Sequence, residues 1–291
     1  MPRTIEEGFD DFHDHLKLIK IESEAVKSHR ISIKACLENN FELDRFFKTG
    51  SIGNGTNVNS YSDTDYFAVI PRKNLKQDSA ATLRHVKEAL QQRFSTTEGI
   101  HISSPAVVVP FGTAKSETTE IIPADFIKTE NSVNIYDIPD GNGGWMKSSP
   151  KAHNDYVTNI NSKLSNKAKP LIRFMKAWKF YNNVSIISFY LEMRIAKYAS
   201  EEESIFYSID INNILKNLIN IDLSSMVNPS GIPGMIESCK SEFDKKDAIS
   251  KLNTAYSRAE KAREEEKKQN IEDAFYWWNL FFSGKFPSYY R

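Results

Sequence analysis

The sequence predicts an α+β fold, in which a long N-terminal helix precedes a small mixed sheet with helices and a C-terminal helical lobe. Three observations predict it. Residues 5–40 space their apolar side chains as a helix does, short apolar runs between residues 66 and 127 are typical of strands, and almost everything beyond residue 151 has helical periodicity. We therefore divide the chain into regions 1–40, 41–137 and 138–291.

The first region is predicted to be one long helix bridging the two lobes. It contains neither Gly nor Pro after Gly8, and its apolar residues recur roughly on one face. These residues are Phe9, Phe12, Leu16, Leu18, Ile19 and Ile21.

The second region carries the strand candidates. Tyr66–Ile70 is a short apolar run ended by Pro71, which suits a buried strand. Two further strands are expected at 106–111 and 118–127, joined by a polar turn at 112–117. Together they predict a small mixed sheet.

Helices account for most of the remaining chain. Residues 79–94 form a helical pattern with Ser79 available as its N-cap, whereas 138–151 is dense in Gly, Pro, Asn, Asp and Ser and predicts an irregular loop at a domain boundary. Beyond this loop we expect helices at 151–166, 169–182, 185–199, about 210–220 and about 242–283.

Two segments near the C-terminus could be read as interaction sites. The charge run 257–269 mixes both signs at helical spacing, which favours a solvated helix face over a binding tail. The aromatic ending YWWNLFFSGKFPSYY could dock a partner, but we expect it to pack into the core.

Composition excludes several classes of protein. Lys plus Arg (38) equals Asp plus Glu (38), so there is no global electrostatic case for a nucleic-acid coat or a membrane-surface protein. No segment approaches the roughly 18 apolar residues of a membrane helix, and the first twenty residues lack the apolar core of a signal peptide. Cys36 and Cys239 belong to no disulfide or zinc pattern. We expect a cytoplasmic protein that binds neither nucleic acid nor membrane.

The chemistry is concentrated in GSIGNGTNVNSYSDTDYFAVIP, Gly50–Pro71. Side chains at positions i and i+2 of a strand share a face, so Asp63 and Asp65 can place two carboxylates side by side, where a divalent cation would relieve their repulsion. Gly50 and Ser51 offer backbone N–H groups and a hydroxyl to phosphate oxygens. Either half alone is common in structural turns, but the combination favours metal-dependent phosphate chemistry.

This stretch resembles a known signature. Gly-Ser, eleven further residues and Asp-x-Asp leading into an apolar strand are typical of the nucleotidyltransferase superfamily related to DNA polymerase β. Within it, the stretch looks like the GS…T…SDxD element of the bacterial cGAS/DncV-like nucleotidyltransferases (CD-NTases). Further matches follow in order, at TEIIPA (119–124), IPDGNGGWMKSSPKAH (138–153), KPLIRFMKAW (169–178) and ISFYLEM (187–193).

The resemblance implies both fold and activity. Region 41–137 would be a polymerase β-like nucleotidyltransferase catalytic core, and region 138–291 a helical substrate-binding lobe. The enzyme would condense NTPs (ATP, GTP, UTP or CTP) into a cyclic di- or trinucleotide second messenger with release of pyrophosphate. Its role would be bacterial anti-phage (CBASS) signalling, in which the product reaches a downstream effector.

Such enzymes use a third carboxylate, and one strand offers two candidates, Glu120 and Asp125. The resemblance favours Glu120, because the acid usually stands a few residues before a small residue, as in EIIPA, although the family more often has Asp there. The implied site holds two Mg²⁺ (or Mn²⁺) ions on Asp63, Asp65 and Glu120.

The expected helix 169–182 carries a basic stripe. Lys169, Arg173 and Lys176 fall on one face, opposite an apolar face. Taken alone, such a stripe is usually solvated. The resemblance implies instead that Lys176 binds the donor triphosphate.

The resemblance also implies the other nucleotide contacts. Gly50, Ser51 and Ser188 would hold the triphosphate, and Phe189 would stack on the donor base, although an aromatic residue in a helix is otherwise ordinary core. Asn161 could meet a base edge or could equally be a surface residue.

Two other functions remain open on sequence grounds. One is a template-independent nucleotidyltransferase of the same superfamily that modifies an RNA or protein acceptor. The other is a non-catalytic nucleotide-binding protein, against which the complete set of acids speaks.

Overall fold

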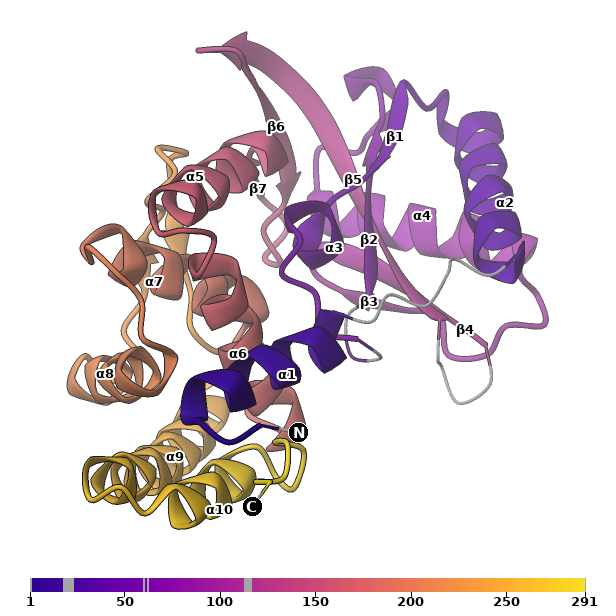
Figure 1. Ribbon diagram of the computed structural model, residues 1–291. Coiled ribbons are helices and arrows are strands. Elements are labelled where there is room, and N and C mark those ends of the chain that lie inside the picture. Colours follow the sequence, from indigo (N-terminus) through magenta and orange to yellow (C-terminus); the bar gives the residue numbers. More distant parts are fainter. Residues whose placement is uncertain (1, 18–23, 60, 62, 113–116, 291) are drawn as a thin grey trace.

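The computed structural model describes residues 2–17, 24–59, 61, 63–112 and 117–290 (Figure 1). It has the predicted α+β fold, with a seven-stranded mixed sheet beside a helical lobe. The helices are α1 (Ile5–Lys17), α2 (Glu24–Phe41), α3 (Gly50–Asn54), η1 (Arg72–Asn74), α4 (Ser79–Arg93), α5 (Pro150–Lys163), α6 (Ala168–Tyr181), α7 (Ser188–Ser200), α8 (Tyr207–Asn220), α9 (Glu242–Lys267) and α10 (Ile271–Phe281). The strands are β1 (Arg45–Lys48), β2 (Thr64–Val69), β3 (His101–Ser103), β4 (Ala106–Phe111), β5 (Glu117–Glu130), β6 (Val133–Pro139), β7 (Trp145–Ser148), β8 (Met226–Val227) and β9 (Met235–Ile236).

The sheet is organised around β5, which is long enough to pair twice. Its first half lies between β2 and β4 in the order β1-β2-β5-β4-β3, and its second half pairs with β6, which pairs with β7. Among the described residues of this sheet, β2 and β5 pair in parallel, and the other pairings are antiparallel. The two central strands therefore run side by side in the same direction.

Alternation along the strands separates two faces of the sheet. Ala68 and Ile121 point toward α2 and α4, where they form a core with Ile33 and Leu90. The residues of opposite parity, among them Phe67, pack on the other face with Ala124, Tyr136 and Ile138. In Figure 1, α2 and α4 cover one side of the sheet and the helical lobe lies on the other.

Helix α6 lies at the centre of the helical lobe. Nearly every residue from Ala168 to Trp178 is buried, including two cations, Arg173 and Lys176. A helix that is buried all round is a core helix.

Within the part of the chain that the structure describes, no helix has both the length and the apolar character needed to cross a bilayer.

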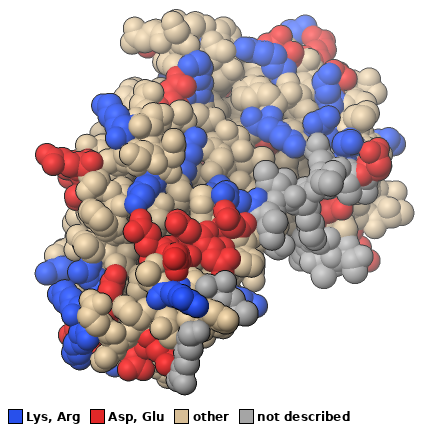
Figure 2. All heavy atoms as spheres, in the orientation of Figure 1, with Lys and Arg blue, Asp and Glu red and all other residues tan. Residues whose placement is uncertain are grey.

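Helix α1 is amphipathic and packs on this lobe. Its apolar residues Ile5, Phe9, Phe12 and Leu16 are buried. Its acids Glu6, Glu7, Asp10 and Asp14 are exposed, and Asp11 is half-buried. In Figure 2, red side chains gather where α1 lies in Figure 1.

The predicted single N-terminal helix is instead described as α1 and α2, with different directions and different lobes (Figure 1). Phe9 of α1 packs into the helical lobe, whereas Ile33 of α2 packs on the sheet. One straight helix could not bury both faces. Leu18, Ile19 and Ile21 of the predicted apolar face lie outside the described residues.

The prediction of an irregular loop over 138–151 was wrong, because this segment contains the end of β6 and all of β7. Pro139 pairs with Trp145, so the Gly-rich residues 140–144 form the turn of a hairpin. Gly141 and Gly143 have positive φ, which such a turn requires. The sheet lobe thus extends past the predicted boundary at residue 137.

Two helix ends also differ from the sequence prediction. The single C-terminal helix expected over 242–283 is broken between α9 and α10, where Gln269 adopts φ 63° and the chain turns back. The N-cap of α4 is Asp78, whose side chain accepts a hydrogen bond from the Ala80 N–H, rather than Ser79. The core packing predicted for the aromatic ending is confirmed, since its members Trp278, Phe281, Phe282 and Phe286 are buried.

We expect Phe9→Ala to destabilise the protein strongly. The Phe9 ring is 1% exposed and lies 5.1 Å from each of the rings of Phe174, Trp278 and Phe286. Removing it leaves a cavity that should cost about 3–5 kcal/mol in urea unfolding. The control is Tyr276→Ala on α10, whose side chain is exposed and whose loss should cost under about 0.5 kcal/mol. Equal losses for the two variants would contradict this packing.

Candidate active site

The parallel register of β2 and β5 brings the acids together. Asp65 pairs with Glu120, followed by Phe67 with Ile122 and Val69 with Ala124. These residues share the sheet face turned away from α2 and α4, because the residues between them pack on those helices. Asp63 precedes Asp65 by two positions, so all three predicted carboxylates gather at the same end of the two strands.

Asp125, the competing third acid, points elsewhere. It follows Ala124 in β5, so its side chain faces the side opposite to Glu120. Its carboxylate lies 3.7 Å from the Arg72 guanidinium, and the residue pairs with Asp137 of β6. The structure therefore places Glu120, and not Asp125, next to Asp65.

The three carboxylates repel one another. Burial, followed by the charge of Glu120, raises the pKa of Asp63 to about 6, although part of its surface remains exposed. The pKa of Asp65 is raised well above its usual range by burial, by the charge of Glu120, by a hydrogen bond with Glu120 and by the charge of Asp63. The charges of Lys176 and Lys179 act in the opposite direction, on Asp65 and on Asp63 respectively.

These acids fit a divalent cation by their chemistry. They supply hard oxygen ligands, and a carboxylate that shares a hydrogen bond with another carboxylate must hold a proton that a cation could replace. Over residues 2–17, 24–59, 61, 63–112 and 117–290, no three His, Cys, Asp or Glu side chains are already grouped to hold a metal ion. The donor set is therefore suitable but is not arranged as a finished coordination sphere.

Gly50 is required where α3 meets Asp65. Its φ is +62°, and a Cβ atom at this position would lie 1.7 Å from Oδ2 of Asp65. The Thr49 N–H donates a 2.9 Å hydrogen bond to the Asp65 carbonyl, which holds the start of α3 against β2. Ser51 follows in the first turn of α3, so the predicted Gly-Ser pair begins the helix whose start lies against Asp65.

Lys176 is held inside the protein. Its ammonium forms an ion pair with Glu192 of α7 and donates a 3.0 Å hydrogen bond to Oγ1 of Thr56. Glu192 also accepts hydrogen bonds from Thr56, at 2.8 Å, and from Asn54. All four residues are buried, so removing one ion would leave an uncompensated buried charge at a cost of about 3–5 kcal/mol.

The remaining residues of the predicted basic stripe are also engaged. Arg173 donates hydrogen bonds to the carbonyls of Gly55, at 2.6 Å, and Asn57, at 2.7 Å, in the segment that leads to Asp63. Lys169 donates to Oγ1 of Thr158 at 3.1 Å. The stripe is therefore not a solvated face, since it fastens α6 to the glycine-containing segment and to α5.

Ser188 and Phe189 open helix α7. Ser188 lies one turn before Glu192 and thus on the same side of the helix. Phe189 is 38% exposed, and its ring lies 4.7 Å from that of His153. An exposed aromatic ring at a helix start can receive a planar group, as the sequence predicts for Phe189.

Asn161 is used within the helical lobe. Its Nδ2 donates to Oδ1 of Asn166, and its Oδ1 accepts from the Lys169 N–H, both at 2.9 Å. The residue is buried. Both ends of the amide thus join the C-terminal part of α5 to the start of α6.

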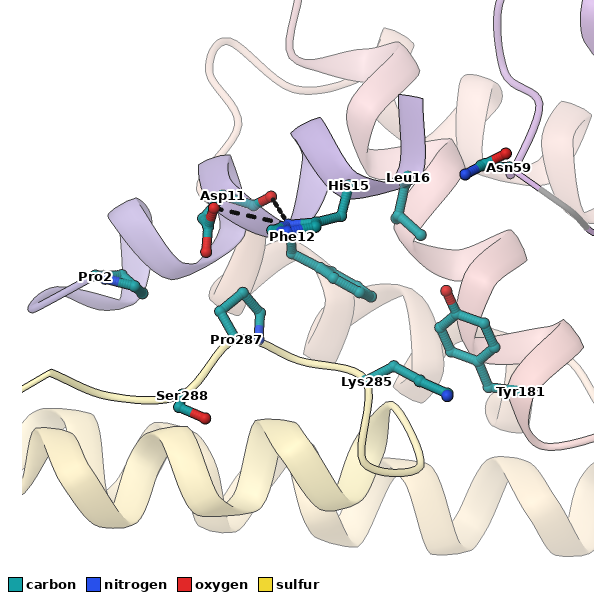
Figure 3. Close-up of a pocket in the computed structure, with 10 residues that line it drawn as sticks. All are labelled: Pro2, Asp11, Phe12, His15, Leu16, Asn59, Tyr181, Lys285, Pro287 and Ser288. Carbon is teal, nitrogen blue, oxygen red and sulfur yellow. Dashed lines mark hydrogen bonds and ion pairs between the residues drawn. The ribbon is translucent and has the colours of Figure 1, made fainter. Parts of the chain in front are cut away.

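A cavity of about 460 Å³ lies away from the acids. It is formed by α1, the C-terminal segment, Asn59 and Tyr181 (Figure 3), and none of the three carboxylates lines it. The candidate site is at the carboxylates instead, because they lie together on the sheet and the pKa values of Asp63 and Asp65 are raised.

Sequence reasoning missed Glu192, Thr56 and Lys179. Glu192 lies in the matched stretch ISFYLEM and Thr56 in the stretch with Asp63, so both were within quoted motifs. Lys179 is three positions after Lys176 and could have been found by extending the basic stripe by one turn.

Comparisons with known proteins agree with this geometry. Residues 4–161, more than half of the chain, match the family described as Second Messenger Oligonucleotide or Dinucleotide Synthetase domain (SMODS). A probable cyclic nucleotide synthase of Bacillus cereus strain VD146 is 28% identical over 177 residues, which cover 58% of this chain and 52% of that relative. The match thus spans about half the length of this curated relative.

Solved structures share the fold over nearly the whole chain. CdnC of E. coli MS115-1, in complex with HORMA-deltaN, is 16% identical with a TM-score of 0.70, covering 97% of this chain and 98% of that one. DncV cyclic AMP-GMP synthase of Vibrio cholerae, in complex with the linear intermediate 5′ pppA(3′,5′)pG, is 14% identical with a TM-score of 0.65, covering 97% and 86%. At these identities the likeness establishes the fold alone.

We expect Gly50→Ala to be more destabilising than Gly55→Ala. Both residues have positive φ, so both substitutions pay a backbone cost of about 1–2 kcal/mol. Only at Gly50 does the new Cβ also meet Asp65, whereas at Gly55 it meets nothing within 4 Å. Urea unfolding should show a further loss of about 1–3 kcal/mol for Gly50→Ala. Indistinguishable variants would refute the contact with Asp65.

The stability of the metal-free protein should fall as pH rises through the range in which Asp63 titrates. The pKa of Asp63 is about 6 in the folded protein against 3.8 as the reference value, so the folded state binds more protons between these values. The loss of folding stability caused by the raised pKa of Asp63 is absent below about pH 4 and complete above about pH 7. The Asp63→Asn variant has no carboxylate at this position and so does not lose this stability. In EDTA, the Tm of the variant minus the Tm of the wild type should therefore increase between pH 4.5 and pH 7. An excess that does not change with pH would contradict the repulsion, and exposed Asp44→Asn is the control.

Proposed function

Because the chain belongs to the family of second messenger oligonucleotide or dinucleotide synthetase (SMODS) domains, we propose that it is a nucleotidyltransferase that makes a cyclic oligonucleotide. It condenses NTPs into a cyclic di- or trinucleotide and releases pyrophosphate. The observation that carries this proposal is the pairing of Asp65 with Glu120 across β2 and β5, with Asp63 two residues earlier.

In this proposal Asp63, Asp65 and Glu120 hold two Mg²⁺ or Mn²⁺ ions. When bound, such ions neutralise charge on the attacking and leaving oxygens of the transferred phosphoryl group. The three carboxylates fix the place of reaction on the sheet, and a carboxylate or solvent accepts the proton of the attacking ribose hydroxyl. The raised pKa values of Asp63 and Asp65 support this assignment, because unbalanced negative charge is what a divalent cation would neutralise.

The donor nucleotide lies between the lobes in this proposal. Gly50 and Ser51 meet its triphosphate from the sheet side, and Ser188 meets it from α7. Phe189 stacks on the base, which its exposure at the start of α7 supports. Asn161 is left out of the base contacts, since both ends of its amide bind within the helical lobe.

We also propose the biological setting implied by the resemblance to the CD-NTases, which is anti-phage (CBASS) signalling through a downstream effector in the cytoplasm. The relative named as a probable cyclic nucleotide synthase supports the product class. On the face shown in Figure 2, basic and acidic side chains are interspersed. This favours free NTPs over a polynucleotide, which would call for an extended basic groove.

We expect the protein to convert NTPs into a phosphatase-resistant product without a primer. Radiolabelled ATP, GTP, CTP and UTP with Mg²⁺ or Mn²⁺, followed by phosphatase and mass spectrometry, would detect it. Label found only on added RNA or protein would favour the alternative acceptor. The absence of product and of labelled acceptor, together with bound nucleotide, would favour a non-catalytic protein.

Asp65→Asn and Glu120→Gln should each lower the rate of product formation by about 100-fold or more, since each removes a charge that holds the metals. Asp125→Asn is the matched control in the same strand, because it faces the other side of the sheet and binds Arg72. Its rate should stay within about threefold of the wild type. The assignment fails if Asp125→Asn is the inactive variant and Glu120→Gln is active.

A further inference from the structure

The segment 55–59 follows α3 of the sheet lobe but is embedded in the helical lobe. Its residues form neither helix nor strand, and the chain continues from it toward Asp63. Val58 is fully buried in the core of the helical lobe, together with Phe12 of α1 and Trp178 of α6. Contacts with these helices, and not strand pairing, therefore set the position of the segment.

Arg173 of α6 holds this segment at two points. Its Nη2 donates a 2.6 Å hydrogen bond to the Gly55 carbonyl, and its Nε donates a 2.7 Å hydrogen bond to the Asn57 carbonyl. A guanidinium presents its N–H groups in a rigid planar fork, so two bonds from it fix both the distance and the orientation of the segment against α6. The more flexible ammonium of a lysine would not reproduce this pair of bonds.

The third nitrogen of the guanidinium faces α1. Nη1 of Arg173 lies at hydrogen-bond distance from Nε2 of His13, which is half-buried. Arg173 can only donate, so Nε2 of His13 must be the acceptor and must carry no proton. Burial lowers the pKa of His13 to about 4, with the charges of Arg173 and Lys17 adding to the shift and that of Asp14 opposing it. The imidazole is therefore neutral at pH 7, as this hydrogen bond requires.

Helix α1 also bonds to the far end of the segment. The Asn59 N–H donates a 3.0 Å hydrogen bond to the carbonyl of Leu16, and both residues are labelled in Figure 3. Tyr61, the next described residue, packs against the ring of Tyr181 at 5.2 Å. The chain is thus attached to α1 and α6 up to two residues before Asp63.

Asp63 is the carboxylate that depends most on this attachment. Asp65 and Glu120 lie in paired strands, and the register of β2 with β5 sets them opposite each other. Asp63 stands just before β2, which begins at Thr64, so it lies outside that pairing. Its position relative to the other two acids is therefore set by the chain that precedes it.

We propose that His13 and Arg173 are positioning residues, which hold Asp63 in place for a divalent cation. Both act through the backbone, because His13 orients the guanidinium and the guanidinium holds the segment 55–59. This inference rests on the proposed function, since it concerns the carboxylates of the same site. Residues that orient the ligands of a metal commonly change its affinity by about 10–100-fold when they are replaced.

The first test measures metal binding without nucleotide. Mn²⁺ is titrated into the full chain at pH 7, well below the lowest Tm of the set, and free Mn²⁺ is measured by its EPR signal. We expect His13→Leu and Arg173→Met each to weaken Mn²⁺ binding by about 10-fold or more. His13→Gln retains an acceptor for Arg173 and should stay within about threefold of the wild type. The control is His15→Leu, an exposed position of the same helix.

The second test measures product formation from NTPs. With Mn²⁺ just saturating for the wild type, the rate of His13→Leu should be about 10-fold lower. A tenfold higher Mn²⁺ concentration should return it to within about threefold of the wild type, because mass action refills a weakened site. A loss of folded protein would not be recovered in this way by His13→Gln and by added metal alike.

Wild-type Mn²⁺ affinity in His13→Leu and Arg173→Met, with a lowered Tm, would show that these bonds are structural only and would overturn the inference. Equal losses of affinity in His13→Leu and His13→Gln would also overturn it. The two His13 variants decide the matter if Arg173→Met does not fold. If the wild type binds Mn²⁺ but forms no product, the proposed function fails while the Mn²⁺ affinities still decide the inference. If the wild type binds no Mn²⁺, both fail.

Discussion

The repulsion among Asp63, Asp65 and Glu120 is the constraint around which this molecule is arranged. The acids cannot separate, because the parallel pairing of β2 with β5 sets Asp65 opposite Glu120. That register is fixed by the buried residues that follow on both strands, since a shift by one position would turn every one of them to the other face. Burial and the nearby charge of Glu120 raise the pKa values of Asp63 and Asp65, at a cost in stability that a bound cation would offset.

Helix α6 of the helical lobe places three cations, each with different partners, near the segment that carries these acids. Arg173 holds the backbone carbonyls of the segment before the acids, and Lys176 is neutralised by Glu192 while it bonds to Thr56. Lys179 remains beside the acids without a carboxylate partner among the described residues. Successive cations of one helix thus have different partners, namely backbone carbonyls for Arg173 and a buried carboxylate for Lys176.

The sequence was sufficient for the local features of the site. Asp63 and Asp65 follow from strand alternation, and the apolar runs at β2 and β4 were placed within two residues of their observed ends. The choice between Glu120 and Asp125 depended on resemblance, because the parity of β5 is known only once its pairing with β2 is known. Local spacing therefore predicts which residues of one strand share a face, but it does not predict which strands pair or which faces of two strands lie on the same side of the sheet.

Features that depend on tertiary contacts could not be obtained in this way. The resemblance identified Lys176, and Glu192 lies in another of the matched motifs, but neither motif shows that the two side chains form a buried ion pair. The Gly-rich segment 140–144 has the composition of a loop, and only its flanking pairings make it a hairpin. The helical periodicity over 242–283 continues through the break between α9 and α10, since periodicity reports burial on one side and not the direction in which the chain runs.

The position of α1 links the beginning of the chain to its end. Phe9 packs against Trp278 and Phe286, and the Tyr290 N–H donates to the Pro2 carbonyl at 3.0 Å. On a ribosome adding about 5–20 residues per second, these partners follow Phe9 by roughly 10 to 60 s. Helix α1 can pack on Phe174 of α6 before then, but its aromatic contacts are complete only after α10 and the segment that follows it have been made.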